Sequence, residues 1–226
     1  MELMLDSANL KNIRYYTEVF PLVGITSNPS ILKKEGKLEL INHFKEIQNI
    51  IGNERSLHIQ VTTDKSEKIV EEAYKIIEKL GKDVYIKIPV NEEGLKAIKK
   101  LKNENFNITA TAIYTMAQGD YAIMAGVDYI APYFNRMENT NIDPERGISH
   151  YAKMIQSGNF QTKILAASFK NIGQVMRAFE SGAHCATVDP ALLSTSLNMP
   201  SIEMAVADFK KDWEDVYGKD KTFLDI

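Results

Sequence analysis

The sequence predicts an α/β protein built as a single (β/α)8 TIM barrel with one additional helix at its C-terminal end. Three observations favour this fold. Short runs rich in β-branched and aromatic residues alternate with longer amphipathic stretches almost to the end of the chain. Eight such runs occur within 226 residues, which fits a compact closed barrel. No glycine-rich nucleotide-binding fingerprint follows the first run, which disfavours a doubly wound open sheet.

Each predicted strand is a short run that ends at polar or turn-forming residues. In chain order, the runs are Glu2–Asp6, Val23–Thr26, Leu57–Val61, Val84–Val90, Ile108–Thr111, Tyr129–Pro132, Lys163–Ser168 and Cys185–Val188. Helical patterns separate most of these runs. Such alternation indicates a parallel sheet with helices on its outside.

Apolar residues that recur every three or four positions predict the intervening helices. The clearest pattern covers Ser66–Leu80, and the same periodicity is found in Glu92–Lys102 and Asn171–Glu180. We expect the eighth helix of the barrel near Pro190–Ser196. The further periodic stretch Pro200–Tyr217 is then surplus to a barrel.

The surplus helix, residues 200–217, carries the large aromatic side chains Phe209 and Trp213. It either caps the barrel or docks on a neighbouring subunit, and we expect the second. No low-complexity linker divides the chain, so residues 1–226 are expected to form one barrel domain.

Composition excludes several classes of protein. Hydrophobic residues make up 44% and charged residues 25%, which is typical of a globular domain and not of a disordered chain. The net charge of −3, without any basic block, argues against nucleic acid as a partner. No signal-peptide pattern opens the chain, and no apolar run reaches the roughly 18 residues that span a bilayer. We therefore expect a cytoplasmic protein without a membrane partner.

Metal chemistry is not expected. The single cysteine, Cys185, excludes a disulfide framework and any zinc site built on paired cysteines. The four histidines are not spaced as metal ligands, and His58 is interpreted as a hydrogen-bonded core residue.

Lys87 is the sharpest candidate for a catalytic residue. In the run Val84–Val90, period-two alternation puts four apolar residues toward the helices and Lys87 toward the barrel interior. Burial disfavours the ammonium form, so the amine becomes nucleophilic near neutral pH, as Schiff-base formation requires. The alternative interpretations are an exposed edge lysine and a structural ion pair with Asp6.

Asp6 ends the first predicted strand, and the polar turn Thr26–Ser30 follows the second. Strand ends carry the chemistry of such barrels. Asp6 is a candidate for proton transfer or for orienting Lys87. It is equally a candidate cap for the helix that begins near Leu10. The turn is interpreted either as a helix start or as a site for a polyol.

A candidate anion site follows the later strands. Arg136 comes after the sixth strand, and Ser168 and Lys170 come after the seventh. Two cations, a hydroxyl and a helix start near Asn171 suit a phosphate group. The alternative is that both cations are solvated surface charges.

Taken together, several segments resemble the transaldolase family, and within it the small branch of fructose-6-phosphate aldolases. The turn and the lysine-bearing strand, in this order, form a specific combination. The matching segments are Met4–Asp6, Gly24–Ser30, Ile86–Pro89, Gly94–Ile98, Ala131–Arg136 and Ala166–Lys170.

The resemblance implies a metal-free class I aldolase without a cofactor, acting on a sugar phosphate. Lys87 would form a Schiff base with a dihydroxyacetone unit, while Asp6, Thr26 and Asn28 hold its hydroxyl groups. Gln60, Thr111 and Tyr133 would place a water molecule. Arg136 and Ser168, together with Lys170, would hold the phosphate. The resemblance also implies a large ring-like homo-oligomer, with a decamer as the expected size.

Two residues favour the aldolase branch. The resemblance places a glutamate and a phenylalanine in transaldolases where Gln60 and Tyr133 stand here. We therefore expect cleavage and formation of fructose 6-phosphate, from dihydroxyacetone and glyceraldehyde 3-phosphate. The alternative is a transaldolase of the pentose phosphate reactions, which transfers the dihydroxyacetone unit to an aldose phosphate such as erythrose 4-phosphate. A metal-free phosphosugar isomerase and a non-catalytic sugar-phosphate-binding protein also remain open.

Overall fold

A computed structural model describes residues 1–225, and its strands form a closed parallel barrel. Each strand pairs in parallel with the next, and the last pairs with the first. The strands are β1 (Glu2–Asp6), β2 (Leu22–Thr26), β3 (Ser56–Gln60), β4 (Tyr85–Pro89), β5 (Ile108–Ile113), β6 (Tyr129–Pro132), β7 (Lys163–Ala166) and β8 (Cys185–Val188). The predicted (β/α)8 fold is confirmed.

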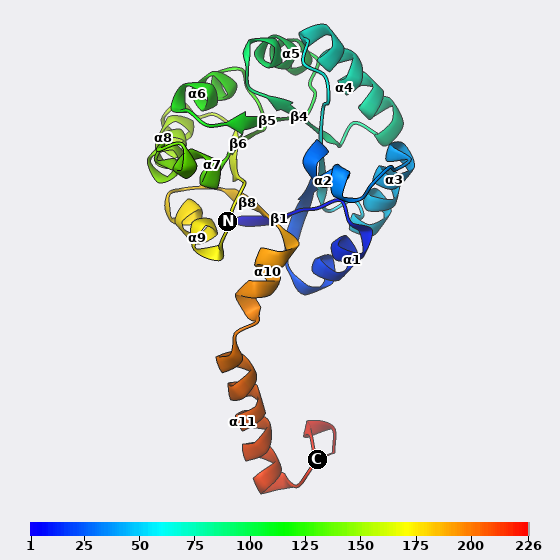
Figure 1. The fold of residues 1–226 in the computed structure, drawn as a ribbon, viewed down its shortest axis with the longest axis vertical. Helices are drawn as coiled ribbons and strands as arrows, with labels where there is room; N and C mark the ends of the chain where they lie inside the picture. The colour runs from blue at the N-terminus through cyan, green and yellow to red at the C-terminus, as the bar shows by residue number, and fades with distance from the viewer. Residues whose placement is uncertain (226) are drawn as a thin grey trace. The chain divides into compact units, whose positions relative to one another are not determined.

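Helices surround these strands (Figure 1). They are α1 (Leu10–Val19), α2 (Pro29–Lys34), α3 (Leu40–Ile51), α4 (Ser66–Leu80), α5 (Glu92–Lys102), α6 (Met116–Met124), α7 (Phe134–Asn139), α8 (Pro144–Ser157) and α9 (Ile172–Glu180). Both α4 and α5 begin and end where the apolar periodicity predicts. The α9 helix begins one residue later than predicted, because Asn171 is its cap.

Alternation along β4 separates two environments. Ile86 and Ile88 are fully buried in the layer between strands and helices. Tyr85 and Lys87 belong to the other face, and Tyr85 packs against a buried cluster that includes Met4 and Tyr129. The barrel interior is therefore a filled core. Lys87 is the next interior residue after Tyr85, toward the C-terminal end of β4.

His58 occupies the interior beside that aromatic layer. Its ring stacks on Tyr85 with centroids 4.5 Å apart, and its two nitrogens are 2.8 Å from Thr109 Oγ1 and 2.9 Å from Ser56 Oγ. Burial, with a smaller contribution from the nearby Lys87 charge, holds the pKa of His58 well below its ordinary value. The prediction of a hydrogen-bonded core histidine is confirmed.

Two backbone features shape the site end of the barrel. A side chain at Gly94 would put its Cβ 1.9 Å from the Pro89 carbonyl oxygen, so glycine lets α5 start against the end of β4. The predicted strand Lys163–Ser168 ends earlier, at Ala166. Ser168 has a φ of 63°, a left-handed conformation that cannot continue a strand.

Residues 191–225 belong to a second compact unit, separate from the barrel unit of residues 1–190. Helix α10 (Pro190–Leu197) begins at the junction, and α11 (Pro200–Tyr217) has the bounds that the periodicity predicts. A 3-10 helix, η1, covers Phe223–Asp225. Within this unit Trp213 packs against Tyr217 and Phe223.

Candidate active site

The candidate catalytic residues share one end of the barrel. Asp6, Thr26 and Gln60 are the last residues of β1, β2 and β3. The register pairs Asp6 with Thr26 and Gln60 with Lys87. Because all strands are parallel, their C-terminal ends meet at the same mouth, where barrels of this kind bind substrates.

Lys87 is a buried amine, only 5% exposed. Its Nζ donates a hydrogen bond to the Ser27 carbonyl oxygen at 2.9 Å, so it is not an exposed edge residue. Burial lowers the pKa of Lys87, and the negative charge of Asp6 opposes this shift in part. The deprotonated, nucleophilic amine is therefore populated at lower pH than for an ordinary lysine.

Asp6 is the carboxylate whose negative charge acts on Lys87. Burial raises the pKa of Asp6, while the Lys87 charge and a hydrogen bond from Thr26 work against that shift. The alternative role of helix cap belongs to Asn9, whose side chain accepts from the Asn12 amide at 3.0 Å. The Asp6 side chain remains available to the site.

A chain of hydroxyl groups fixes Asp6 in place. Thr26 Oγ1 donates to Asp6 Oδ1 at 2.6 Å and lies 2.6 Å from Thr187 Oγ1. Since the Thr26 hydrogen goes to Asp6, Thr187 is the donor to Thr26. Both threonines are buried. Thr26 thus contacts the carboxylate directly; its predicted contact with the substrate remains a prediction.

Asn28 caps the short helix α2. Its Oδ1 accepts from the Ile31 amide at 3.0 Å. This confirms the helix-start interpretation of the turn. The cap uses the amide oxygen alone, so the amide nitrogen of Asn28 can still donate to a ligand hydroxyl.

Tyr133 and Thr111 form a hydroxyl pair at the mouth. Tyr133 OH lies 3.1 Å from Thr111 Oγ1, and burial raises the pKa of the phenol. In residues 1–225, Gln60 Oε1 and Ser27 Oγ are buried polar atoms with no hydrogen-bond partner. Buried groups of this kind normally bind water or a ligand. The same end of the barrel thus holds the buried amine of Lys87, the amide of Gln60 and the hydroxyl groups of Thr111 and Tyr133.

A backbone hydrogen bond joins the segments that carry Arg136 and Ser168. Arg136 lies on α7, and the amide of the preceding Asn135 donates to the Ser168 carbonyl at 2.9 Å. The guanidinium stands 5.0 Å from the centroid of the Tyr133 ring and donates to Tyr114 OH at 3.1 Å. Lys170 lies in the same loop as Ser168 and is exposed to solvent.

Sequence reasoning missed three residues near this site: Thr187, Tyr114 and Gln174. Thr187 stands two residues after Cys185 on β8, so period-two alternation places both side chains on the interior face. Tyr114 contacts Arg136 from the loop after β5. Gln174 bonds to the Lys170 amide from α9. Neither of these contacts leaves a local pattern in the sequence.

Metal-ligating side chains are not clustered here. Among residues 1–225, no group of three or more His, Cys, Asp or Glu side chains is arranged to hold a metal ion. The same part of the chain contains no helix with the length and apolar character needed to cross a membrane.

Comparisons with known proteins agree with the fold. Residues 3–222 match the family described as Transaldolase/Fructose-6-phosphate aldolase. The chain is 48% identical over 213 residues to a protein of Streptococcus pneumoniae (strain ATCC 700669 / Spain 23F-1) named probable fructose-6-phosphate aldolase. That match covers 94% of this chain and 96% of the relative. The barrel and these matches define an enzyme of the aldolase type. The chain belongs to the transaldolase/fructose-6-phosphate aldolase family.

Proposed function

We propose that this enzyme cleaves and forms fructose 6-phosphate through a Schiff base on Lys87, with dihydroxyacetone and glyceraldehyde 3-phosphate as the other reactants. The observation that carries the proposal is the buried Lys87 amine with its lowered pKa, at the mouth of the barrel. The Streptococcus pneumoniae relative is named probable fructose-6-phosphate aldolase, and this name supports the choice of substrate.

The first half of the reaction breaks a carbon–carbon bond. The Lys87 amine adds to the ketone of fructose 6-phosphate, and loss of water leaves a protonated imine. This iminium withdraws electrons, so the bond between the α and β carbons breaks as the β hydroxyl gives up its proton. Glyceraldehyde 3-phosphate leaves, and the enamine of dihydroxyacetone remains on Lys87. Asp6 is the proposed acceptor of that hydroxyl proton.

The second half returns the free enzyme. The enamine takes a proton on its α carbon and becomes an iminium again. Water then adds to the iminium carbon and releases dihydroxyacetone and the Lys87 amine. A water held by Gln60, Thr111 and Tyr133 supplies the proton, since Tyr133 has a hydroxyl that can pass it on.

Arg136 and Ser168 are the proposed phosphate ligands, with Lys170 as an additional cation. A guanidinium suits a phosphate because it donates several hydrogen bonds in a planar fork. Asn28, through its free amide nitrogen, is the proposed donor to a dihydroxyacetone hydroxyl. Thr26 is assigned to the same hydroxyl cluster through its bond to Asp6.

The test supplies fructose 6-phosphate alone and measures glyceraldehyde 3-phosphate. The proposal predicts steady release without any acceptor aldehyde. Release only after erythrose 4-phosphate is added would contradict the proposal and support transfer of the dihydroxyacetone unit. Both reactions share the Schiff base, so the fate of the enamine decides between them.

We also propose that the enzyme is a homo-oligomer whose α11 helices pack on neighbouring subunits. No residue of α11 is buried, and Phe209 is 71% exposed. A helix with exposed large apolar residues normally has a partner surface. Light scattering on the full chain should give a multiple of the monomer mass, with ten subunits as the expected size. Truncation after Met199 should lower it, and a monomeric full-length protein would contradict this proposal.

A further inference from the structure

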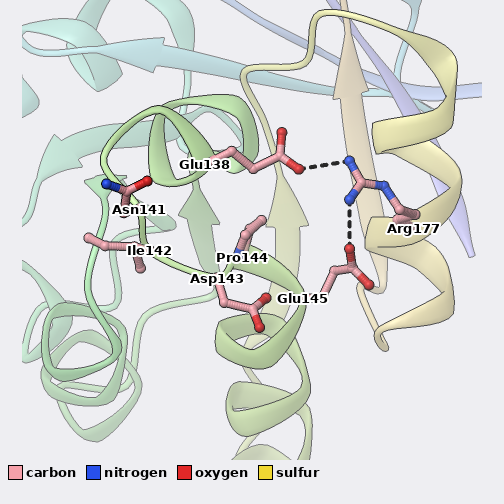
Figure 2. A pocket seen from close by; sticks show the side chains of 7 residues that line it. All are labelled: Glu138, Asn141, Ile142, Asp143, Pro144, Glu145 and Arg177. Atoms are coloured by element: carbon pink, nitrogen blue, oxygen red, sulfur yellow. Dashed lines mark hydrogen bonds and ion pairs between the residues drawn. The ribbon is translucent and has the colours of Figure 1, made fainter.

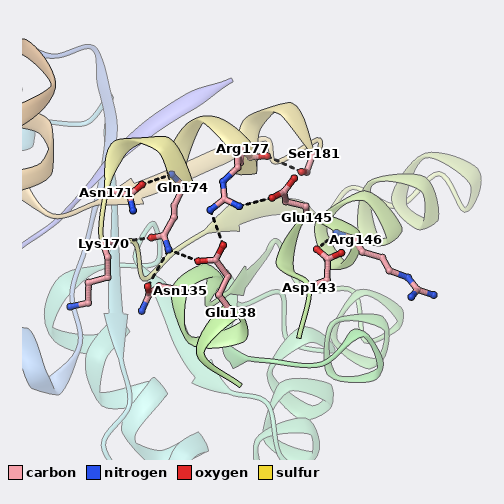
Figure 3. Close-up of polar contacts among 10 residues, drawn as sticks. All are labelled: Asn135, Glu138, Asp143, Glu145, Arg146, Lys170, Asn171, Gln174, Arg177 and Ser181. Carbon is pink, nitrogen blue, oxygen red and sulfur yellow. Dashed lines mark hydrogen bonds and ion pairs between the residues drawn. The ribbon is translucent and has the colours of Figure 1, made fainter. Parts of the chain in front are cut away.

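A buried amide bridges the two segments that carry the proposed phosphate ligands. Gln174 of α9 is 3% exposed. Its Oε1 accepts from the Lys170 backbone amide at 2.6 Å, and its Nε2 donates to Asn135 Oδ1 at 3.1 Å and to Glu138 Oε2 at 2.5 Å (Figure 3). Both amide hydrogens and the carbonyl oxygen are therefore engaged. One side chain ties α7 to the loop after β7.

The bridge continues outward through an ion pair. Arg177 Nη2 donates to Glu138 Oε1 at 2.7 Å, and its Nη1 donates to Glu145 Oε1 at 2.7 Å. Figure 2 shows the guanidinium between the two glutamates, at the edge of a surface pocket of about 520 Å³. The Glu138 carboxylate thus has one oxygen on Gln174 and the other on Arg177. Its orientation is set from both sides.

The tied segments are those of the anion site. Asn135 directly precedes Arg136, and its backbone amide holds the Ser168 carbonyl at 2.9 Å. Ser168 has a φ of 63°, which is unfavourable for a residue with a Cβ and persists only where neighbours hold it. Gln174 binds the loop at Lys170, two residues past that strained position.

We propose that Gln174 is a positioning residue for phosphate recognition: it holds α7, with Arg136, against the loop that carries Ser168. This inference rests on the proposed function, because it needs a phosphate bound by Arg136 and Ser168. A binding group must be held in place by its neighbours to act at full strength. The role of Gln174 is confined to the phosphate, since its contacts do not include Lys87, Asp6 or Tyr133 among the described residues.

The test measures synthesis with saturating dihydroxyacetone and two acceptors that differ only in the phosphate, glyceraldehyde 3-phosphate and glyceraldehyde. Gln174→Met keeps the length of the side chain and removes all three hydrogen bonds. KM for glyceraldehyde 3-phosphate should rise about tenfold or more, because a misplaced guanidinium loses most of a charge-assisted hydrogen bond. KM for glyceraldehyde and the rate at saturation should stay close to wild type.

The isosteric Gln174→Glu is the second variant, and it keeps the assay decisive if the methionine variant does not fold. It retains an acceptor for the Lys170 amide but sets a carboxylate against Glu138, so α7 alone is released. The same split between the two acceptors is expected. Glu138→Gln keeps an acceptor for Gln174 and weakens the Arg177 contact, so a smaller shift in the same direction is expected.

Gln48→Met is the matched control. Gln48 Nε2 donates to the Leu80 carbonyl at 2.7 Å, so the same substitution also breaks a bond between two helices, at the opposite end of the barrel. Thermal unfolding is followed for every variant. The control should lower the melting temperature without separating the two KM values.

The outcomes distinguish the inference from the proposed function. Arg136→Ala should raise KM for glyceraldehyde 3-phosphate but not for glyceraldehyde. If it does not, both the phosphate assignment and the inference are wrong. If Arg136→Ala has this effect and both Gln174 variants leave KM unchanged, only the role of Gln174 is overturned. Equal changes for both acceptors would likewise overturn it, because they indicate a general structural role.

Discussion

The Tyr133 hydroxyl lies 3.1 Å from the Thr111 hydroxyl, at the end of the barrel where Lys87 forms its hydrogen bond to Ser27. Burial raises the pKa of Tyr133, so the phenol keeps its proton at neutral pH. A protonated hydroxyl beside a second hydroxyl can pass a proton to water or to the enamine. This pair underlies the proposed release of dihydroxyacetone.

Tyr133→Phe should therefore slow the release of dihydroxyacetone while leaving the Schiff base intact. General acid–base groups contribute about a hundredfold or more to rate, so acceptor-free cleavage of fructose 6-phosphate should fall by that order. Transfer to erythrose 4-phosphate should fall much less, since it does not need protonation of the enamine. Product analysis by chromatography, with and without acceptor, measures the balance. Equal losses in both reactions would contradict the assigned role of Tyr133.

The hydroxyl chain behind Asp6 gives a second prediction. Thr187→Val preserves shape but leaves the Thr26 oxygen without its donor, which costs about 1 kcal/mol of stability. Because Thr26 then orients Asp6 less well, kcat/KM should fall several-fold. Thr187→Ser restores the donor and should restore most of the activity. Denaturant unfolding measures the loss of stability, and steady-state kinetics on the two variants measure the loss of activity. Equal activity of the serine and valine variants would contradict the role of the hydrogen bonds that link Thr187, Thr26 and Asp6.

A third prediction concerns pH. Deprotonated Lys87 is the proposed nucleophile, so imine formation should increase as pH rises through the lowered pKa of this lysine. The Asp6 charge raises that pKa, so Asp6→Asn should move the rise to lower pH. The rate of borohydride-trapped adduct formation with dihydroxyacetone, followed by mass spectrometry, gives the profile even for a slow variant. Glu71→Gln, on an exposed part of α4, is the control and should leave the profile in place. A shift of the Asp6→Asn profile to higher pH would contradict the electrostatic coupling.

The fourth prediction is a trade-off between activity and stability. Burying an ammonium group is unfavourable, so Lys87→Met should abolish turnover and raise the melting temperature, by roughly 2–4 °C for each kcal/mol gained. The folded pKa is below the ordinary 10.5, so the gain should be largest at low pH and shrink as pH approaches that value. Lys87→Arg keeps the charge and should be inactive without the gain. Calorimetry across pH measures this; a lower melting temperature for Lys87→Met would show that the bond to Ser27 outweighs the cost of burial.

Local patterns predicted most of the fold. The periodicity of Ser66–Leu80 and Glu92–Lys102 matches α4 and α5 residue for residue, because amphipathic helices leave a strong signal in the sequence. The sequence predicted the ends of the strands less accurately. The predicted strand through Ser168 stops at Ala166, since nothing in the sequence reveals the left-handed backbone of Ser168.

The candidate site was predicted in part for a related reason. Alternation on β4 placed Lys87 in the interior, and the structure confirms its burial. The capping role proposed for Asp6 belongs to Asn9, three residues later, because Asp6, Ser7 and Asn9 are all residue types that cap helices. Contacts such as Thr187 with Thr26 join residues far apart in the chain, and only the closed barrel brings them together.

Reductive trapping is the direct test of a Schiff base on Lys87. The enzyme is incubated with dihydroxyacetone or fructose 6-phosphate, reduced with borohydride, digested and analysed by mass spectrometry. We expect one reduced dihydroxyacetone adduct, on the peptide that contains Lys87, and its loss in Lys87→Arg because a guanidinium does not form this imine. An adduct on another lysine, or no adduct while turnover continues, would contradict the assignment of the Schiff base to Lys87.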